Sequence, residues 1–192
     1  SQAETLGREG ARELCLVGQD LTAYGRDLEG NTGLLDLLGA LETSIPDDIW
    51  LRLLYLHPAR MDEAFIDRLL SFKKVLRYLD IPIQHIDDEM LRRMKRPGTA
   101  SHIRRLFSHA RKADPFFALR TTIIVGFPGE TDEEFNCTYN FFKEINFYKM
   151  HIFKYSPKRG TVAEKMPNQV NGEIKEIRSQ KLIQLSNERT KT

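Results

Sequence analysis

Five polar clusters in the sequence could contribute to one binding site, since each directly follows an apolar stretch. They are Gly18-Gln19-Asp20, His57, Gln84-His85, residues 126–130 (GFPGE) and Tyr155-Ser156. Carboxylate, amide and imidazole groups can hold the hydroxyl and amino groups of a ligand. The two glycines of GFPGE let the backbone approach a flat ligand such as an adenine, and its proline fixes the turn. Each cluster taken alone is equally well explained as the polar end of a strand.

Phosphate-binding loops, catalytic Ser/His/Asp sets and common metal sites have characteristic residue spacings, and the sequence lacks these motifs. GFPGE is not followed by the Gly-Lys-Ser/Thr of a phosphate-binding loop, and no Ser/His/Asp set can be traced. His57, His85 and Glu130 could bind a metal ion, but the histidines lack the HxH or HExxH spacing of common metal sites. A metal-dependent hydrolase or lyase and a docking module without catalysis stay open as alternatives.

Strand-like and helix-like stretches alternate along the chain, which predicts an α/β fold with parallel strands. The expected strands are residues 13–18, 49–56, 75–83, 117–125 and 149–155. The expected helices are residues 33–43, 62–74, 101–113, 131–146 and 173–189, with one more from residue 87. Ser101 and Thr131 are the expected N-caps of the helices that they open. Because parallel strands end at the same edge of a sheet, the five polar clusters should converge on one rim.

The charge and cysteine content restrict the class of protein. The 192 residues carry a net charge of +2, so no global attraction to nucleic acid is implied. Cys15 and Cys137 are far apart in apolar contexts, which favours buried free thiols in a reducing compartment. No apolar stretch reaches the roughly 18 residues of a membrane span. We therefore expect a cytoplasmic protein that does not associate with a membrane.

One stretch of the chain is strongly basic. Residues 91–113 contain no acid but carry Arg92, Arg93, Lys95, Arg96, Arg104, Arg105, Arg111 and Lys112. Such a run is more typical of two solvated helix faces than of a binding patch.

Several segments resemble the radical S-adenosylmethionine methylthiotransferases, and they occur in that family's order. They are GQDLTAYG at 18–25, LYLHP at 54–58, DIPIQHIDDEMLRRM at 80–94, IVGFPGET at 124–131, and YSP at 155–157 followed by GTVA at 160–163. The resemblance covers nearly the whole chain. It implies a partial (β/α)₆ radical SAM barrel of parallel strands that lacks the first strand and the cluster-binding loop after it.

The same resemblance implies that the sequence is a fragment of a longer protein. Residues 1–172 are expected to form the partial radical SAM core, and residues 173–192 a helix leading toward an absent C-terminal domain. The family's CxxxCxxC motif would precede this stretch, and neither Cys15 nor Cys137 belongs to one. We therefore expect the fragment alone to carry no catalytic residue and no metal ligand, to hold no [4Fe-4S] cluster and to be inactive.

The resemblance assigns the rim to S-adenosylmethionine and a substrate. The expected cofactor-binding residues are Gly18, Gln19, Asp20, Gln84, His85, Val125, Gly126, Phe127 and Gly129. The expected substrate-side residues are His57, Tyr155 and Ser156. In the full-length protein, a [4Fe-4S] cluster reduced by a flavodoxin-type electron donor would cleave S-adenosylmethionine to a 5′-deoxyadenosyl radical. That radical would remove hydrogen from an unactivated C–H bond, and sulfur and a methyl group would follow.

Two branches of the family compete for the substrate. Gln84-His85 resembles the branch that modifies an aspartate of a small-subunit ribosomal protein, because the tRNA-modifying branch more often has Gln-Ser at this point. Lys158 and Arg159 depart from the ribosomal branch, which favours acidic residues there. Since the rim residues face the substrate, they favour the ribosomal protein as partner, with tRNA as the alternative.

Overall fold

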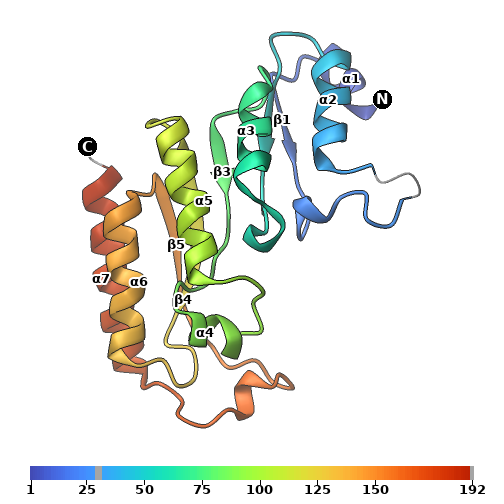
Figure 1. Ribbon diagram of the computed structural model, residues 1–192. Helices are drawn as coiled ribbons and strands as arrows, with labels where there is room; N and C mark the ends of the chain where they lie inside the picture. Colours follow the sequence, from blue (N-terminus) through green and yellow to red (C-terminus); the bar gives the residue numbers. More distant parts are fainter. Residues whose placement is uncertain (29–31, 191–192) are drawn as a thin grey trace. The chain divides into compact units, whose positions relative to one another are not determined.

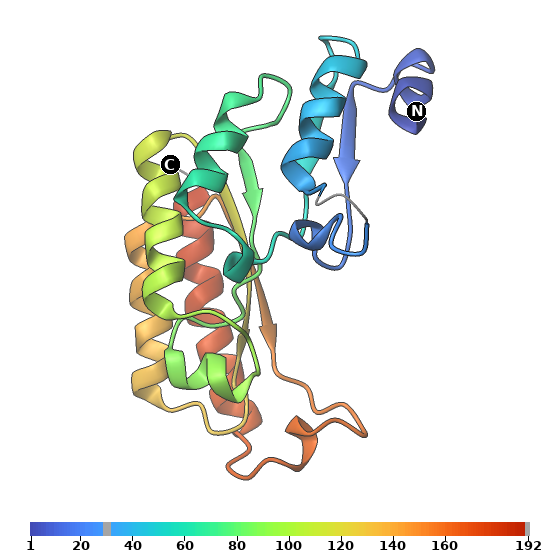
Figure 2. The same cartoon turned by 45° about the vertical axis from the view of Figure 1, so that its right-hand side comes forward.

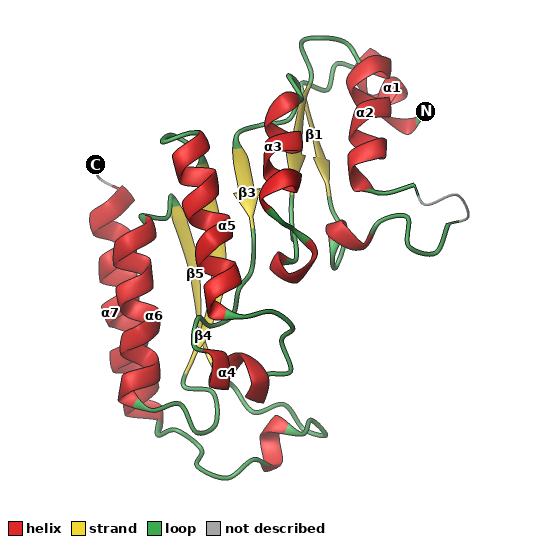
Figure 3. Ribbon diagram, in the orientation of Figure 1, coloured by secondary structure: helices red, strands yellow, loops and turns green. Residues whose placement is uncertain are grey.

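The computed structural model describes residues 1–28 and 32–190, and in this part of the chain helices alternate with strands (Figure 1). The strands are β1 (Glu13–Leu16), β2 (Trp50–Leu53), β3 (Tyr78–Asp80), β4 (Ala118–Val125) and β5 (Lys149–Lys154). The helices are α1 (Gln2–Arg8), α2 (Leu34–Ser44), α3 (Glu63–Ser71), α4 (Asp88–Arg93), α5 (Ala100–Ala113), α6 (Asp132–Ile145) and α7 (Gly172–Thr190). The short 3₁₀ turns are η1 (Leu21–Ala23), η2 (Pro58–Arg60) and η3 (Ala163–Lys165). Figure 3 shows the alternation, which confirms the predicted α/β class.

The chain divides into two compact units. The first unit comprises Ser1–Ile81 and Arg105–Leu119, and the second comprises Pro82–Arg104 and Arg120–Thr192. The boundary expected near residue 172 is a different division and stays a prediction. Lys191 and Thr192, the end of the predicted C-terminal helix, lie outside the described residues.

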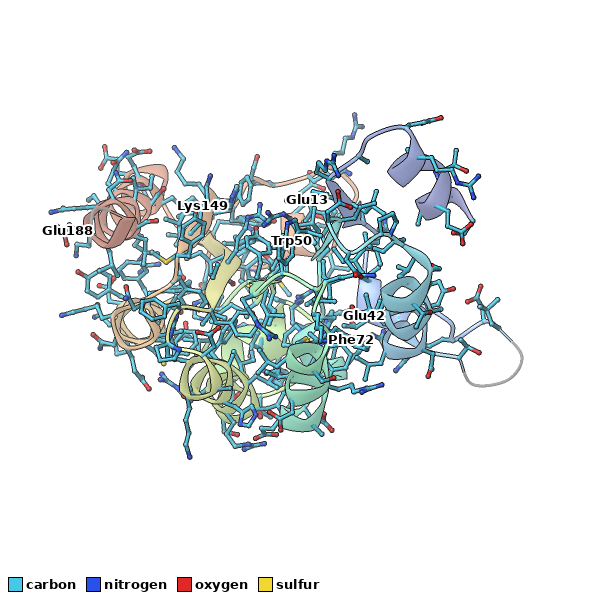
Figure 4. All side chains as sticks on the ribbon, turned by 90° about the horizontal axis from the view of Figure 1, so that it is seen from above. Glu13, Glu42, Trp50, Phe72, Lys149 and Glu188 are labelled. Carbon is cyan, nitrogen blue, oxygen red and sulfur yellow. The ribbon has the colours of Figure 1, made fainter. Side chains whose placement is uncertain are left out.

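In the first unit, β1 and β2 form a parallel pair connected by the crossover helix α2. Their register begins with Glu13 opposite Trp50, which are labelled in Figure 4. The chain after α3 continues the pairing, since Leu51 forms a parallel bridge with Val75. The side chains that fill this unit are almost fully buried: Leu38, Leu51, Leu53, Ile66 and Leu69. Burying these side chains in the parallel arrangement provides most of the stabilisation, at roughly 1.5–3 kcal/mol per large apolar side chain.

The strand β3 is shorter than the stretch of residues 75–83 predicted from apolar content. The chain turns tightly after the bridge at Val75, where the N–H of Tyr78 donates to the carbonyl of Leu76 at 2.7 Å. Regular strand geometry then holds only over Tyr78–Asp80. Pro82 follows closely and has no N–H with which to continue a ladder.

In the second unit, β4 and β5 are parallel, with register from Arg120 opposite Lys149 to Val125 opposite Lys154. The connecting helix α6 is opened by Thr131, whose side chain accepts from the N–H of Glu134 in a capping box, as predicted. At the end of α6 and the turn after it, the buried rings of Phe141, Phe142 and Phe147 contact one another. Phe135, nearer the start of α6, is also buried and lies against Tyr139. Helix α7 packs on β5 and beside α6, as Figures 1 and 2 show.

The basic stretch predicted to form solvated helix faces is largely paired with acids and carbonyls. Arg92 pairs with Glu89, Arg93 with Glu134, Arg104 with Glu144 and Arg105 with Glu63. Arg96 donates to the carbonyl of Pro82, and Arg111 to those of Pro115 and Phe117.

The predicted cap of α5 is wrong by two residues. The helix begins at Ala100, and the side chain of Thr99, not Ser101, accepts from the N–H of His102 at 3.2 Å. Both residues are good N-caps, so local propensity did not distinguish them.

Candidate functional site

In the second unit, the backbone of Gln84 pairs with the carboxyl-terminal part of β4. The N–H of Gln84 donates to the carbonyl of Thr122 at 2.9 Å, and its carbonyl accepts from Ile124 at 3.0 Å. Gln84 has a positive φ of 68°, so the chain changes direction here immediately after its bridge to Ile123. The side-chain oxygen Oε1 of Gln84 is buried and has no hydrogen-bond partner among the described residues. A buried amide oxygen without a partner is unfavourable and indicates a place where a ligand or water would bind.

The 126–130 turn directly follows β4 and is closed by its own glutamate. Glu130 folds back so that its Oε2 accepts from the N–H of Gly126 at 2.5 Å. Gly126 and Gly129 have φ of 71° and 79°, in the left-handed region that favours glycine. The N–H of Gly129 donates to the carbonyl of Asn168 at 2.8 Å, which ties the turn to the long segment before α7.

His85 lies under this turn with its imidazole fully buried. Its Nδ1 accepts from the N–H of Asp87 at 3.0 Å, so the ring proton belongs on Nε2. Nε2 is 3.1 Å from Oε1 of Glu130 and donates to it. The hydroxyl of Thr138 in α6 lies 3.3 Å from each ring nitrogen. Both nitrogens of His85 are therefore occupied by the protein, and the ring holds α6 and the 126–130 turn together.

A third side chain, Arg178 of α7, completes this buried network. Its Nη1 donates to Oε2 of Glu130 at 2.7 Å and to the carbonyl of Glu130 at 3.1 Å. Its Nη2 donates to Asp132 at 2.8 Å, and the resulting hydrogen bond and positive charge lower the pKa of Asp132. The side chains of Glu130 and Arg178 are 1% and 6% exposed, so this ion pair is shielded from water. A buried carboxylate that accepts from this set of donors is fixed in position.

Tyr155 and Phe127 form an aromatic wall beside the turn. Their rings meet edge to face, with centroids 5.1 Å apart, and the N–H of Tyr155 donates to the carbonyl of Val125 at 2.8 Å. The hydroxyl of Tyr155 has no hydrogen-bond partner among the described residues. Lys175 of α7 covers this wall, since its Nζ donates to the carbonyl of Tyr155 at 3.1 Å and lies 5.1 Å from the ring centroid. Ser156 follows as an exposed residue.

In the first unit, Asp20 and His57 come together at the ends of β1 and β2. The N–H of Leu21 donates to the carbonyl of Tyr55 at 3.1 Å, which joins the two strand ends. Asp20 accepts from the hydroxyl of Thr22 and, at 2.6 Å, from Nε of Arg60. The N–H of His57 donates to the same Thr22 hydroxyl at 3.2 Å. Partial burial alone would raise the pKa of Asp20, but the hydrogen bonds from Thr22 and Arg60 outweigh it and keep the pKa below its usual value.

Replacing Arg60 should therefore change the titration of Asp20. Arg60→Gln is expected to raise the pKa of Asp20, whereas Arg60→Lys should raise it less because the charge is kept. The pKa of Asp20 is depressed in the folded chain, so its ionised form stabilises the fold above the unfolded-state pKa. That contribution is lost as the pH falls through the folded-state pKa and should be smaller in Arg60→Gln. NMR titration of the Asp20 carboxyl carbon measures the shift, and an unchanged pKa in Arg60→Gln would contradict this account.

The predicted site residues thus fall into two groups. Gln84, His85, Val125, Gly126, Phe127, Gly129, Tyr155 and Ser156 belong to the second unit, and Gly18, Gln19, Asp20 and His57 belong to the first. In the first unit Asp20 and His57 lie together around Thr22, and Gln19 is exposed. In the second unit Gln84, Gly126 and Tyr155 lie at the carboxyl-terminal part of β4. Convergence of all five clusters on one rim stays a prediction, as does each residue's role.

Arg60, Lys175 and Arg178 contact these clusters but were not predicted as site residues from the sequence. Arg60 lies three positions after His57, and this proximity was the only available signal. Lys175 and Arg178 are two charges in a highly charged helix, and nothing in their local spacing distinguishes them from solvated neighbours.

The metal-site alternative gains no support from these contacts. Among the residues that the structure describes, no three His, Cys, Asp or Glu side chains are grouped as metal ligands would be. Glu130, which that alternative requires, already accepts hydrogen bonds from Gly126, His85 and Arg178.

Comparison with known proteins identifies related sequences and folds. A family model described as the radical SAM superfamily matches residues 1–142. Two relatives, from Geobacter sulfurreducens and Syntrophus aciditrophicus, are both described as ribosomal protein uS12 methylthiotransferase RimO. They are 43% and 44% identical to the chain over 183 residues, which is 95% of the chain but 41% and 40% of the relatives. The chain therefore spans about two-fifths of the length of these relatives.

A solved structure shows the same fold at low sequence identity. Coproporphyrinogen III oxidase (HemN) from Escherichia coli, described as a radical SAM enzyme, is 20% identical and superposes with a TM-score of 0.63. The match covers 80% of this chain and 36% of the other. This likeness confirms the predicted partial α/β barrel fold with parallel strands. In the part of the chain that the structure describes, no helix is both long enough and apolar enough to cross a membrane.

Proposed function

Since the chain belongs to the radical SAM superfamily, we propose that it forms part of a methylthiotransferase that acts on ribosomal protein uS12. The observation that carries this proposal is the identity of 43% to such an enzyme across 95% of the chain. The chain represents about two-fifths of that relative, so the proposal concerns a longer protein to which these residues contribute. A cytoplasmic location follows from a ribosomal substrate.

The second unit offers groups that suit S-adenosylmethionine. An adenine presents an amino donor and ring-nitrogen acceptors at its edge. The carbonyl of Gly126 and the N–H of Phe127 have no hydrogen-bond partner among the described residues and can satisfy both. The unpaired Oε1 of Gln84 and the hydroxyl of Tyr155 add an acceptor and a donor nearby in the same unit. When bound, this cofactor supplies the carbon radical and the methyl group of the reaction.

The role of this chain's own residues is to bind the cofactor, to orient it and to shield it from water. Glu130 and His85 hold the 126–130 turn in one conformation, which fixes the backbone groups of Gly126 and Phe127. The rings of Phe127 and Tyr155 pack edge to face and would shield a cofactor beside them from water, which would protect a reactive carbon centre from side reactions. In the first unit, Asp20 stays ionised beside Arg60 and can accept from hydroxyl or amino groups of the cofactor.

The described residues do not fit a [4Fe-4S] cluster. Such a cluster needs several thiolates close together. The chain has only two cysteines, Cys15 and Cys137, and neither belongs to a CxxxCxxC motif. The prediction that both thiols are buried is wrong for Cys15, which is exposed, while Cys137 is partly buried. We infer that the cluster ligands, and the contact with an electron donor, lie elsewhere in the longer protein.

An aspartate of uS12 is the preferred substrate, with tRNA as the alternative. An RNA substrate needs basic side chains that are free to contact phosphates. Six arginines of residues 91–113 instead pair with acids or carbonyls of the protein itself. This pairing supports a protein substrate.

The proposal is tested by mass spectrometry of uS12 and of bulk tRNA. A protein of the relatives' length that contains this sequence should be expressed in a host lacking its own uS12 methylthiotransferase. We expect uS12 to gain the mass of one methylthio group on an aspartate, and tRNA to stay unchanged. The matched control carries Asp20→Asn, which should abolish most of the modification. A methylthio group on tRNA adenosine would select the alternative branch, and modification of neither would overturn the proposal.

A further inference from the structure

We propose that Arg178 of α7 is a positioning residue that acts through Glu130 to hold the 126–130 turn ready for the cofactor's nucleoside. The inference rests on the proposed function for the identity of the ligand. The mechanical part, that α7 fixes the turn, rests on contacts within the second unit alone.

Glu130 is the only carboxylate that the turn contains, and its position depends on a distant partner. Its Oε2 accepts from the N–H of Gly126 at 2.5 Å and from Nη1 of Arg178 at 2.7 Å. With a side chain only 1% exposed, the carboxylate cannot be compensated by water. A buried carboxylate without a cation is unfavourable and tends to turn outward toward water, which releases the Gly126 N–H.

Helix α7 contacts the turn at a second point, one helical turn before Arg178. The stem of Lys175 lies against Gly126 so closely that a Cβ placed there would come within 2.2 Å of Lys175 Cγ. Residues three apart on a helix share a face, so Lys175 and Arg178 approach the turn together. Figures 1 and 2 show the amino-terminal end of α7 beside the carboxyl end of β5.

An external clamp is needed because Pro128 restricts only one position of the turn, whereas its two glycines have no side chain to restrict them. Gly126 and Gly129 have many accessible backbone conformations, and each loses much conformational freedom when fixed. The Gly126 carbonyl and the Phe127 N–H can recognise an adenine edge only if their directions are constant. The interactions that fix them include the Glu130 carboxylate, the Lys175 stem and the Asn168 carbonyl that accepts from Gly129. Within the turn the N–H of Glu130 donates to the carbonyl of Phe127, and Arg93 donates to the carbonyl of Pro128. Of these, only the carboxylate requires a buried countercharge.

The experiment compares Arg178→Met with Glu176→Gln. Glu176 lies two residues away on α7 and pairs with Lys154 on β5, but both side chains are about half exposed, so it tests the loss of a surface pair on the same helix. Hydrogen exchange of the Gly126 amide is measured in the 192-residue chain. We expect Arg178→Met to accelerate exchange of the Gly126 amide about tenfold or more, which corresponds to losing one hydrogen bond to a charged group. Glu176→Gln should leave the exchange rate unchanged.

A second measurement addresses the ligand. In the cluster-containing protein of the relatives' length, equilibrium binding of S-adenosylmethionine should be about tenfold weaker for Arg178→Met, and unaltered for Glu176→Gln. If Arg178→Met does not fold, Arg178→Lys replaces it, because lysine keeps the charge but cannot bridge Glu130 and Asp132 with two nitrogens. Arg178→Lys should show an intermediate exchange rate and intermediate binding.

The two measurements separate the possible failures. Unchanged Gly126 exchange in a folded Arg178 variant would overturn the positioning role. Accelerated exchange with unchanged binding would show that the turn is clamped but does not receive the cofactor, which also overturns the inference. If the unaltered protein binds no S-adenosylmethionine while its Gly126 exchange still depends on Arg178, the proposed function fails and the clamp on the turn stands.

Discussion

Glu130→Ala is expected to lower the free energy of unfolding by about 3–5 kcal/mol, the range for removing one partner of a buried ion pair. The substitution leaves the guanidinium of Arg178 buried with only Asp132 and a backbone carbonyl as partners. It also leaves the N–H of Gly126 and Nε2 of His85 without their acceptor. The cost therefore combines a buried cation that has lost its buried partner with two unsatisfied donors. Urea denaturation of the chain, with the midpoint and the slope fitted separately, measures it.

The matched control for this prediction is Glu176→Ala, which removes an ion pair of similar length at the surface. Lys154 and Glu176 are 2.6 Å apart but 51% and 48% exposed. Such exposed pairs contribute about 0–1 kcal/mol to the free energy of unfolding, so the urea midpoint should hardly change. If both variants lost the same stability, burial would not be what makes the Glu130 network important.

Gly126→Ala is the second substitution with a large expected effect, because two separate costs add. Its φ of 71° lies in the left-handed region, where a side chain costs roughly 1–2 kcal/mol. The new Cβ would also lie 2.2 Å from Lys175 Cγ, and relieving such overpacking typically costs about 1–3 kcal/mol. We expect destabilisation of about 2–5 kcal/mol in urea, together with loss of S-adenosylmethionine binding in the longer protein.

Two further variants separate the backbone cost from the steric cost. Gly160 has a similar φ of 83° and nothing within 4 Å of an added Cβ, so Gly160→Ala reports the backbone cost alone. The double variant Gly126→Ala with Lys175→Ala should recover the steric part. The destabilisation of the double variant should be smaller than the sum of the two single destabilisations by about 1–2 kcal/mol. Additive single effects would mean that the Lys175 stem does not restrict the turn.

Local chemistry made much of the fold predictable. Alternating apolar stretches without hairpin turns implied parallel strands, and the strands, helices and polar strand ends were found near their predicted positions. Thr131 could be predicted as an N-cap because its capping-box partner, Glu134, is only three residues away. The exceptions were also local: β3 is short because Pro82 lies close to its end, and α5 begins one residue after Thr99 because two good caps compete.

The class of fold, the motifs after each strand and the family that they resemble could be predicted from the order of the residues. The partners of the polar side chains became visible only in the folded chain. His85 and Asp20 were predicted to bind the cofactor, and the structure adds their protein partners: His85 is buried against Glu130, and Asp20 is paired with Arg60, 40 residues away. Arg178 could not be identified, because its partner Glu130 lies 48 residues earlier in the chain. Strand and helix periodicity reflects neighbours a few residues apart, whereas the partner of a buried charge depends on which distant segments packing brings into contact.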